Sequence, residues 1–255
     1  MELDVAIDPA TMGFRYGTGV HGPEPEFRTL DAIRASLMNP QCSGPNPVYA
    51  IAMDVRREED EDDLRARSLL FGVVAYAAGQ LGKEPVRSQG HVHAIAPHNG
   101  WSPPELFEIW EGAAIVYAQE FTADNPGRCI AVMAGQGEKV VVPPGWAHAV
   151  INADTGRRMV FGAWCDRQYG FEYTELRAYG GLAYFPVVAA EGAIKWVANH
   201  RYQAAGLEQR RTRSYPELGL DPTAPIYAQY RKSPESVEWI AQPQRFVNLW
   251  PRFEP

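Results

Sequence analysis

GEKVVVPPGWAHAVIN, residues 137–152, predicts two strands joined by a tight turn. Pro143 and Gly145 mark the turn between two apolar runs. Every fixed position of the pattern G-x5-P-x-G-x2-H-x3-N is present, at Gly137, Pro143, Gly145, His148 and Asn152. The returning strand starts near His148, so this hairpin can carry an imidazole back across a small barrel.

A second stretch, GHVHAIAPHNGWSPPELFEIWEG at residues 90–112, offers further metal ligands. His91 and His93 are two residues apart, so in a strand both point to the same face. Alternation puts Glu105 and Glu108 on opposite faces, so only one of them can share a face with the metal. An H-x-H pair alone is also compatible with two histidines that are satisfied by neighbouring hydrogen-bond partners.

Short apolar runs separated by Gly, Pro, Asn or Asp indicate an all-β sandwich or barrel. The candidate strands are 47–55, 68–79, 86–95, 106–121, 128–134, 138–144, 148–153 and 158–165. Helical spacing predicts a helix over 29–39, with Thr29 as N-cap. A second short helix is predicted in SPESVEWIAQ, residues 233–242, with Ser233 as N-cap and Pro234 in the first helical position.

Composition narrows the class of partner and the compartment. The 255 residues carry a net charge of −7, which argues against nucleic acid or an anionic membrane as partner. The acidic run at 56–67 is expected to be a solvated loop. Three widely spaced cysteines suggest no disulfide framework, and there is neither a signal peptide nor a long apolar span. We therefore expect a cytoplasmic protein.

The two motifs together resemble the signature of the cupins. This resemblance implies an all-β fold, the double-stranded β-helix or jelly-roll barrel, with a few peripheral helices. Six residues separate Glu105 from Gly112, which is the cupin spacing and implies that Glu108 and Glu111 are solvated or rim carboxylates. The implied ligands of a divalent metal are His91, His93, Glu105 and His148. Fe(II) is the expected ion, and Mn(II), Ni(II) and Zn(II) are the alternatives.

Over residues 26–188 the chain also resembles the cupin-type glucose-6-phosphate isomerases. The similar stretches are RTLDAI, PVYAIAMDV, AGQLGKEPVRSQGHVHA, ELFEIWEGAAIVYAQ, VVVPPGWAHAVIN and YGFEYTEL. The resemblance implies a cytoplasmic homodimer of glycolysis and gluconeogenesis that interconverts glucose 6-phosphate and fructose 6-phosphate. Residues 1–190 would form the isomerase-like domain, and 191–255 an extension that packs on the barrel or at the dimer interface.

The same resemblance assigns roles around the metal. Glu105 and Tyr173 are the implied catalytic residues, with proton transfer between C1 and C2 and a hydride shift as competing mechanisms. The implied substrate contacts are Ser88 and Gly90 for the phosphate, Lys83 or Arg87 for additional charge, and His98 in the long 94–104 insert as a rim residue or substrate contact.

Four departures from the family leave the substrate open. Phe107, Cys165 and Phe171 replace polar residues, and a phosphate-binding threonine falls near Val74 or Ala75. Each lost contact to a substrate typically corresponds to about 1–3 kcal/mol. The alternatives are an isomerase or epimerase for another sugar or sugar acid, a cupin oxygenase acting on a small acid, and a non-catalytic sugar-binding cupin.

Overall fold

The computed structural model describes residues 3–255, and short strands dominate it. The strands are β1 (Val5–Ile7), β2 (Phe14–Tyr16), β3 (Val20–His21), β4 (Glu26–Arg28), β5 (Tyr49–Met53), β6 (Arg56–Arg57), β7 (Leu69–Tyr76), β8 (Gln80–Leu81), β9 (Glu84–Pro85), β10 (Val92–His93), β11 (Glu105–Glu111), β12 (Ala113–Gln119), β13 (Cys129–Gly135), β14 (Lys139–Val142), β15 (Ala147–Asn152), β16 (Met159–Asp166), β17 (Phe171–Glu172), β18 (Tyr184–Val188), β19 (Ile194–Ala198) and β20 (Leu207–Arg211). The α-helices are α1 (Leu30–Ile33), α2 (Glu61–Ala66), α3 (Thr174–Ala178), α4 (Ile226–Lys232) and α5 (Glu238–Ala241), and six single turns of 3₁₀-helix accompany them.

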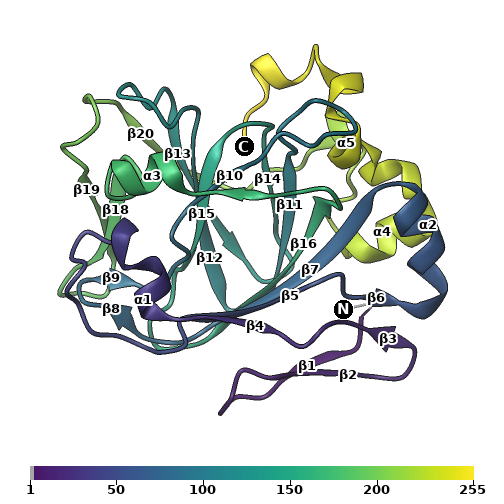
Figure 1. Ribbon diagram of the computed structural model, residues 1–255, viewed down its shortest axis with the longest axis horizontal. Helices are drawn as coiled ribbons and strands as arrows, with labels where there is room; N and C mark the ends of the chain where they lie inside the picture. The colour runs from purple at the N-terminus through teal and green to yellow at the C-terminus, as the bar shows by residue number, and fades with distance from the viewer. Residues whose placement is uncertain (1–2) are drawn as a thin grey trace.

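Two sheets form the barrel (Figure 1). One has six strands in the order β14-β11-β16-β7-β5-β4, and the other has four in the order β15-β12-β13-β20. The side chains between them form a buried apolar cluster that includes Val74, Phe107, Val116, Ile130 and Phe161. This arrangement is a jelly-roll barrel with a few short peripheral helices, which confirms the predicted all-β cupin fold.

Both glycine turns of the sequence motifs carry the chain from one sheet to the other. The predicted hairpin over 137–152 is wrong in one respect, because β14 pairs with β11 whereas β15 pairs with β12. The single candidate strand at 106–121 is two strands, β11 and β12, which meet at Gly112 with φ of +78°. A Cβ at Gly112 would lie 2.8 Å from the carbonyl oxygen of Arg158, so only glycine fits this crossing.

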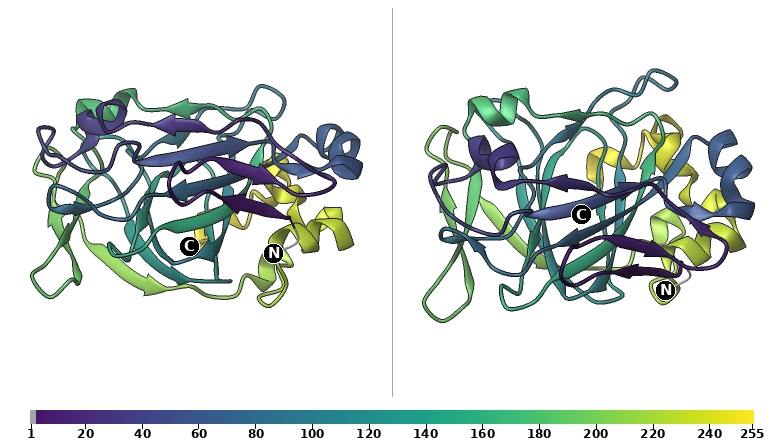
Figure 2. Two further views of the ribbon diagram at one scale, coloured as in Figure 1. Left: turned by 90° about the horizontal axis from the view of Figure 1, so that it is seen from below. Right: turned by 60° about the horizontal axis from the view of Figure 1, so that its bottom comes forward.

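The outer face of each sheet is covered as well. Residues near the N-terminus, among them Val5 and Val20, and the C-terminal segment 215–253 pack against the six-stranded sheet. The buried cluster that they form contains Phe71, Trp164, Tyr227 and Trp239. The β18–β19 hairpin and α3 lie over the four-stranded sheet. Figure 2 shows the C-terminal helices and the β18–β19 hairpin on opposite flanks of the barrel. The predicted boundary at residue 190 falls inside this hairpin, and β20 beyond it pairs in parallel with β13.

The acidic run at 56–67 is not the solvated loop that its charge suggested. It forms β6, a 3₁₀ turn and α2, and Leu64 is fully buried beneath it. Its carboxylates accept hydrogen bonds from the C-terminal segment, from the Tyr227 hydroxyl to Asp60 at 2.8 Å and from the Tyr230 hydroxyl to Asp63 at 2.7 Å. The acidic run is therefore ordered by tyrosines that lie 167 residues later in the chain. The local sequence gives no sign of these partners.

The two predicted helices are present but short. α1 begins after Thr29, whose hydroxyl accepts from the N–H of Ala32 as expected, and a 3₁₀ turn ends the helical segment at Ser36. Residues 234–237 form a 3₁₀ turn that continues into α5, with no capping hydrogen bond from Ser233. Within residues 3–255, no helix has the length and apolar character that a membrane span requires.

Candidate metal centre

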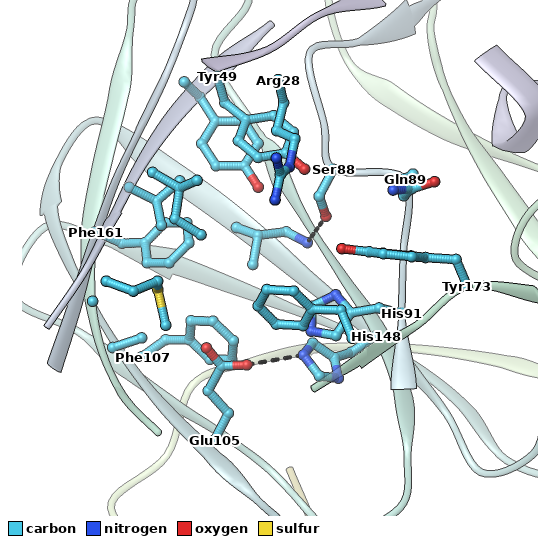
Figure 3. A pocket seen from close by; sticks show the side chains of 18 residues that line it. Arg28, Tyr49, Ser88, Gln89, His91, Glu105, Phe107, His148, Phe161 and Tyr173 are labelled. Carbon is cyan, nitrogen blue, oxygen red and sulfur yellow. Dashed lines mark hydrogen bonds and ion pairs between the residues drawn. The ribbon is translucent and has the colours of Figure 1, made fainter. Parts of the chain in front are cut away.

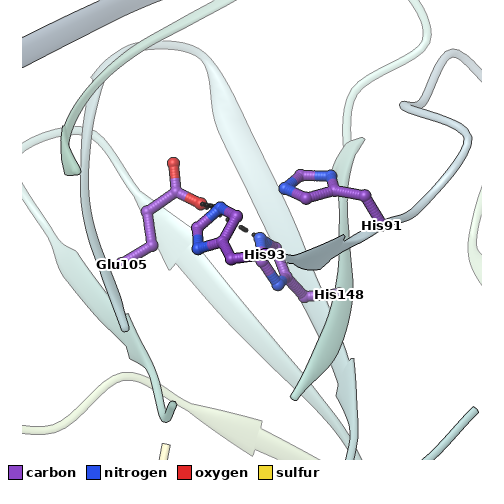
Figure 4. Close-up of side chains that lie close together, drawn as sticks. All are labelled: His91, His93, Glu105 and His148. Carbon is purple, nitrogen blue, oxygen red and sulfur yellow. Dashed lines mark hydrogen bonds and ion pairs between the residues drawn. The ribbon is translucent and has the colours of Figure 1, made fainter. Parts of the chain in front are cut away.

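The four predicted ligands lie close together, three of them on separate strands and His91 just before β10 (Figure 4). β10 holds His93, the first residue of β11 is Glu105, and β15 carries His148. His91 lies opposite His148 in an isolated antiparallel bridge, where the two residues exchange backbone hydrogen bonds of 3.0 and 2.9 Å. One ligand atom from each residue lies within 4.8 Å of the other three, so the sequence motifs do converge.

Most of the centre is buried, and backbone carbonyls fix where the protons of two of its imidazole rings lie. The Nδ1 atom of His93 faces the carbonyl oxygen of Pro103 at 2.9 Å, and that of His148 faces the carbonyl of Trp146 at 3.1 Å. A carbonyl can only accept, so both Nδ1 atoms carry a proton, and in the neutral rings both Nε2 atoms present a lone pair. Glu105 Oε2 is 3.0 Å from His148 Nε2 and 3.3 Å from His93 Nε2.

The Nε2 lone pairs therefore face the Glu105 carboxylate oxygen, with no proton between these hydrogen-bond acceptors. A cation bound between them stabilises such an arrangement. Within the described part of the chain, the Nε2 atoms of His91 and His93 are buried without a hydrogen-bond partner. Three imidazole nitrogens and one carboxylate oxygen are the donor set of a divalent first-row metal. The residues present thus fit the metal that the sequence predicted, although they do not identify the ion.

Burial and mutual contact set the pKa values in the centre. Burial, reinforced by His148 and His93, holds the pKa of His91 well below its usual value, so His91 is neutral and free to bind a metal. Burial opposes ionisation of Glu105, but the close approach of His148 and His93 outweighs it and lowers the pKa of Glu105. Glu105 also accepts a 3.2 Å hydrogen bond from the Cys165 thiol, whose pKa is raised well above its usual value by burial and by the Glu105 charge.

A cavity extends from this centre into the barrel and ends in a cluster of polar groups (Figure 3). Cross-strand register places Arg28 of β4 opposite Tyr49 of β5, and Tyr49 opposite Tyr76 of β7. Opposite residues in a sheet point to the same face, so all three side chains reach the cavity. The other polar residues at this end are Ser88, Gln89 and Tyr173. In Figure 3, Arg28 and Tyr49 lie on the far side of the histidines from Glu105.

Arg28 is the basic side chain of this cavity, and the sequence analysis did not select it. Its side chain is 28% exposed, lies beside the hydroxyls of Tyr49 and Tyr173, and pairs with Glu26 at 2.9 Å. Burial raises the pKa of both tyrosines, so their hydroxyls are hydrogen-bond donors at neutral pH. Arg28 and Tyr49 do lie in RTLDAI and PVYAIAMDV, two of the stretches that carry the family resemblance.

Two predicted substrate contacts lie elsewhere. Lys83 is exposed in the turn between β8 and β9 and does not line the cavity. His98 lies beside Asp166 and the carbonyl of Ala241 instead, at 3.2 Å from each. Arg87, the alternative source of charge, is buried in an ion pair of 2.6 Å with Glu84. Arg87 donates to the carbonyl of Ser88 at 2.8 Å but does not line the cavity, whereas Arg28 of β4 does.

Ser88 lines the polar end of the cavity, and Gly90 follows two residues later in the chain. The Ser88 hydroxyl accepts from the N–H of Val150 at 3.1 Å and hydrogen-bonds with the hydroxyl of Tyr76, which also lines the cavity. Gly90 has φ of +88°, and a Cβ at this position would lie 3.1 Å from the side chain of Leu182. The phosphate roles of both residues, like the catalytic roles of Glu105 and Tyr173, stay predictions.

Glu108 and Glu111 were both expected to be solvated or rim carboxylates, and the structure differs at Glu108. Glu111 is a partly exposed rim residue paired with Arg158, as expected. Glu108 is not solvated: it is 6% exposed, accepts from Trp110 Nε1 at 3.1 Å and lies 3.7 Å from Lys139 Nζ. Strand alternation directed it away from the metal as predicted, but the C-terminal segment covers the face where it lies.

The departures from the family pattern make one wall of the cavity apolar. Val74, Phe107 and Phe171 all line it, and Phe107 packs edge to face on Phe161 at 5.4 Å. Cys165 takes a different position, in contact with Glu105 rather than in the lining. Phe171 packs on His91 and Phe107 on His148, so a ligand in this cavity meets apolar side chains beside the metal centre and polar groups at the far end.

The barrel and the three-histidine, one-glutamate centre define a cupin of the metal-binding type. A family model described as glucose-6-phosphate isomerase (GPI) matches residues 29–204, and the chain belongs to this family. The glucose-6-phosphate isomerase of Thermococcus kodakarensis is 27% identical over 164 residues, which cover 62% of this chain and 75% of that protein. That of Thermococcus gammatolerans is 28% identical over 158 residues, covering 62% and 74%.

Solved structures with similar folds include two oxalate-converting enzymes. An oxalate oxidase aligns with 16% identity and a TM-score of 0.36, over 51% of this chain and 56% of that one. An oxalate decarboxylase variant of B. subtilis aligns with 12% identity and a TM-score of 0.35, over 60% of this chain and 32% of that one.

Proposed function

We propose that the protein is a metal-dependent aldose–ketose isomerase that interconverts glucose 6-phosphate and fructose 6-phosphate. The observation that carries this proposal is the pairing, in one cavity, of a metal centre with a cationic, hydroxyl-rich far end. A hexose phosphate has the same division, with its reacting C1 and C2 at one end and its phosphate on C6 at the other. Membership of the isomerase family supports the same assignment.

At the metal end, Glu105 and the three histidines would hold a divalent ion, for which we propose Fe(II). Such an ion supplies Lewis-acid polarisation of the substrate carbonyl. The lowered pKa of Glu105 keeps the carboxylate ionised. We propose that this carboxylate, at the reacting end of the cavity, would accept the proton from C1 or C2. The neighbouring thiol of Cys165 holds the second carboxylate oxygen and so limits the rotation of this group.

At the far end, Arg28 and Ser88 would bind the phosphate. A guanidinium with adjacent hydroxyl donors is a common recognition group for a phosphate dianion. Tyr173 reaches into the same cavity, and its raised pKa makes it a donor to the substrate. We also propose, with the family, that the enzyme is a homodimer and acts in the cytoplasm.

The test is a coupled isomerase assay on metal-free protein reloaded with Fe(II), Mn(II), Ni(II) or Zn(II). We expect turnover of glucose 6-phosphate in the presence of metal, loss of turnover with chelator, and no oxygen consumption. Glucose serves as the control that lacks the phosphate. Absence of turnover with every metal would refute the proposal, and oxygen uptake with a small organic acid would replace it by an oxygenase. A reaction in D₂O separates proton transfer, which incorporates deuterium at C1 or C2, from a hydride shift, which does not.

The apolar wall favours a second candidate substrate class. Val74, Phe107 and Phe171 offer no hydrogen bond to the hydroxyls in the middle of a hexose. A sugar phosphate with another arrangement of hydroxyls would lose less on binding to this wall. The same assay should therefore include mannose 6-phosphate and a deoxyhexose 6-phosphate. A higher kcat/KM for one of these than for glucose 6-phosphate would identify an isomerase or epimerase of different specificity.

A further inference from the structure

The eleven residues 94–104 connect two of the ligands, His93 and Glu105, and their tip contacts the C-terminal segment. The side-chain amide of Asn99 donates to the carbonyl of Ala241 at 2.9 Å. Nε2 of His98 lies 3.2 Å from the same oxygen. Ala241 is the last residue of α5, where helix carbonyls have no partner within the helix. The insert thus supplies the partner that this helix end lacks.

The same two side chains contact a second buried acceptor. Asp166, the last residue of β16, is fully buried, and its Oδ2 lies 3.3 Å from the Asn99 amide nitrogen and 3.2 Å from Nε2 of His98. Its Oδ1 accepts from the N–H of Gln168 at 2.8 Å and from the hydroxyl of Ser68 at 3.2 Å. Asn99 is therefore held from two sides, by the C-terminal segment and by the barrel.

The residues that follow Asn99 in the insert contact a metal ligand, His93. Asn99 Oδ1 accepts from the N–H of Trp101 at 2.8 Å, which fixes the return of the insert. The hydroxyl of Ser102 then donates to the carbonyl of His93 at 2.6 Å, and the carbonyl of Pro103 accepts from Nδ1 of His93 at 2.9 Å. The Pro103 contact sets the tautomer and the ring orientation of His93, and such outer contacts tune metal affinity.

We propose that Asn99 is a positioning residue of the metal centre, and that the C-terminal segment sets metal affinity through it. Ala241 lies outside the span matched by the family, residues 29–204, so this support is additional to the family's own barrel. The inference rests on the metal centre of the proposed function and does not depend on which sugar binds.

The experiment compares full-length wild-type protein with Asn99→Ala and with a control, Gln242→Ala. Gln242 directly follows Ala241, and its amide donates only within the C-terminal segment, to Glu238 at 3.0 Å. Metal-free protein is titrated with Mn(II) by calorimetry and with Co(II) by visible absorption, and thermal unfolding without metal is recorded. We expect Asn99→Ala to bind both ions about tenfold more weakly, with an altered Co(II) spectrum. Gln242→Ala should bind like wild type.

Two results would overturn the inference. One is a folded Asn99→Ala protein with wild-type affinity and spectrum, and the other is an equal loss of affinity in Gln242→Ala. If Asn99→Ala does not fold, His98→Ala takes its place, because this side chain is 27% exposed and contacts the same two acceptors. An unchanged affinity in folded His98→Ala would then refute the inference. Failure of the wild-type protein to bind either ion would instead refute the metal centre, and with it the proposed function.

Discussion

Replacing Arg28 by methionine tests the cavity's far end most directly. Methionine retains much of the length and apolar contact of the side chain and removes the guanidinium. Arg28 is 28% exposed and its partner Glu26 is 69% exposed, so the guanidinium is mostly shielded while its present ion pair is mostly solvated. A solvated partner competes weakly, which leaves Arg28 available for a phosphate.

A hydrogen bond to a charged group contributes about 1.5–3 kcal/mol. Since about 1.4 kcal/mol corresponds to a factor of ten, Arg28→Met should lower kcat/KM for glucose 6-phosphate by roughly ten- to a hundredfold. The change should be mainly in KM, because the phosphate is remote from the reacting carbons. Lys83→Met is the matched control, since the sequence assigned Lys83 the same role but the structure places it outside the cavity. An unchanged kcat/KM in Arg28→Met, or an equal loss in Lys83→Met, would refute this reading of the cavity.

Three further expectations concern the metal and the core. His148→Ala should lose metal and activity together, measured by metal analysis of the purified variant and the isomerase assay, and full activity would contradict the ligand assignment. A chelator should lower the melting temperature by about 5–10 °C, since ligand at a hundred times its Kd stabilises by about 2.7 kcal/mol and each kcal/mol shifts Tm by about 2–4 °C for a chain near this size; identical melting curves would argue against a bound ion. Trp164→Ala should reduce the free energy of unfolding by about 3–5 kcal/mol, because Trp164 is fully buried, stacks on Tyr227 at 5.3 Å and donates to the carbonyl of Ile226. Denaturation in urea measures this loss, and a change below about 1 kcal/mol would show that the C-terminal segment contributes little to stability.

The sequence was informative where chemistry restricts both residue type and spacing. A metal needs its ligands on a shared face, so spacing paired His91 with His93, and the resemblance to the cupins completed the set with Glu105 and His148 before any fold was known. The turn at Gly145 was located as well, whereas the crossing at Gly112 was placed inside a single strand. The role of the Gly145 turn was not predicted, because whether a turn joins paired strands or crosses between sheets depends on pairings that are remote in the chain.

The far end of the cavity could not be predicted in the same way. Arg28, Tyr49 and Tyr76 come from three strands, and only the register of β4, β5 and β7 places them side by side. No spacing rule connects such residues. The expectation that Glu108 is exposed to solvent was also wrong. A carboxylate is expected in solvent unless a segment that covers it is known. That covering segment begins more than 100 residues later in the chain.

The order in which the chain is synthesised gives the C-terminal segment a further consequence. All four ligands have been made once residue 148 is complete, but the outer face of the sheet that holds Glu105 is covered by residues 215–253. Until these residues leave the ribosome, Phe71 and Trp164 have no apolar cover from this segment. Pairs such as Tyr230 with Asp63 are separated by 167 residues, and contacts this distant in the chain form slowly. The nascent barrel should therefore depend on chaperones, or remain prone to aggregation, until residues 215–253 have been translated.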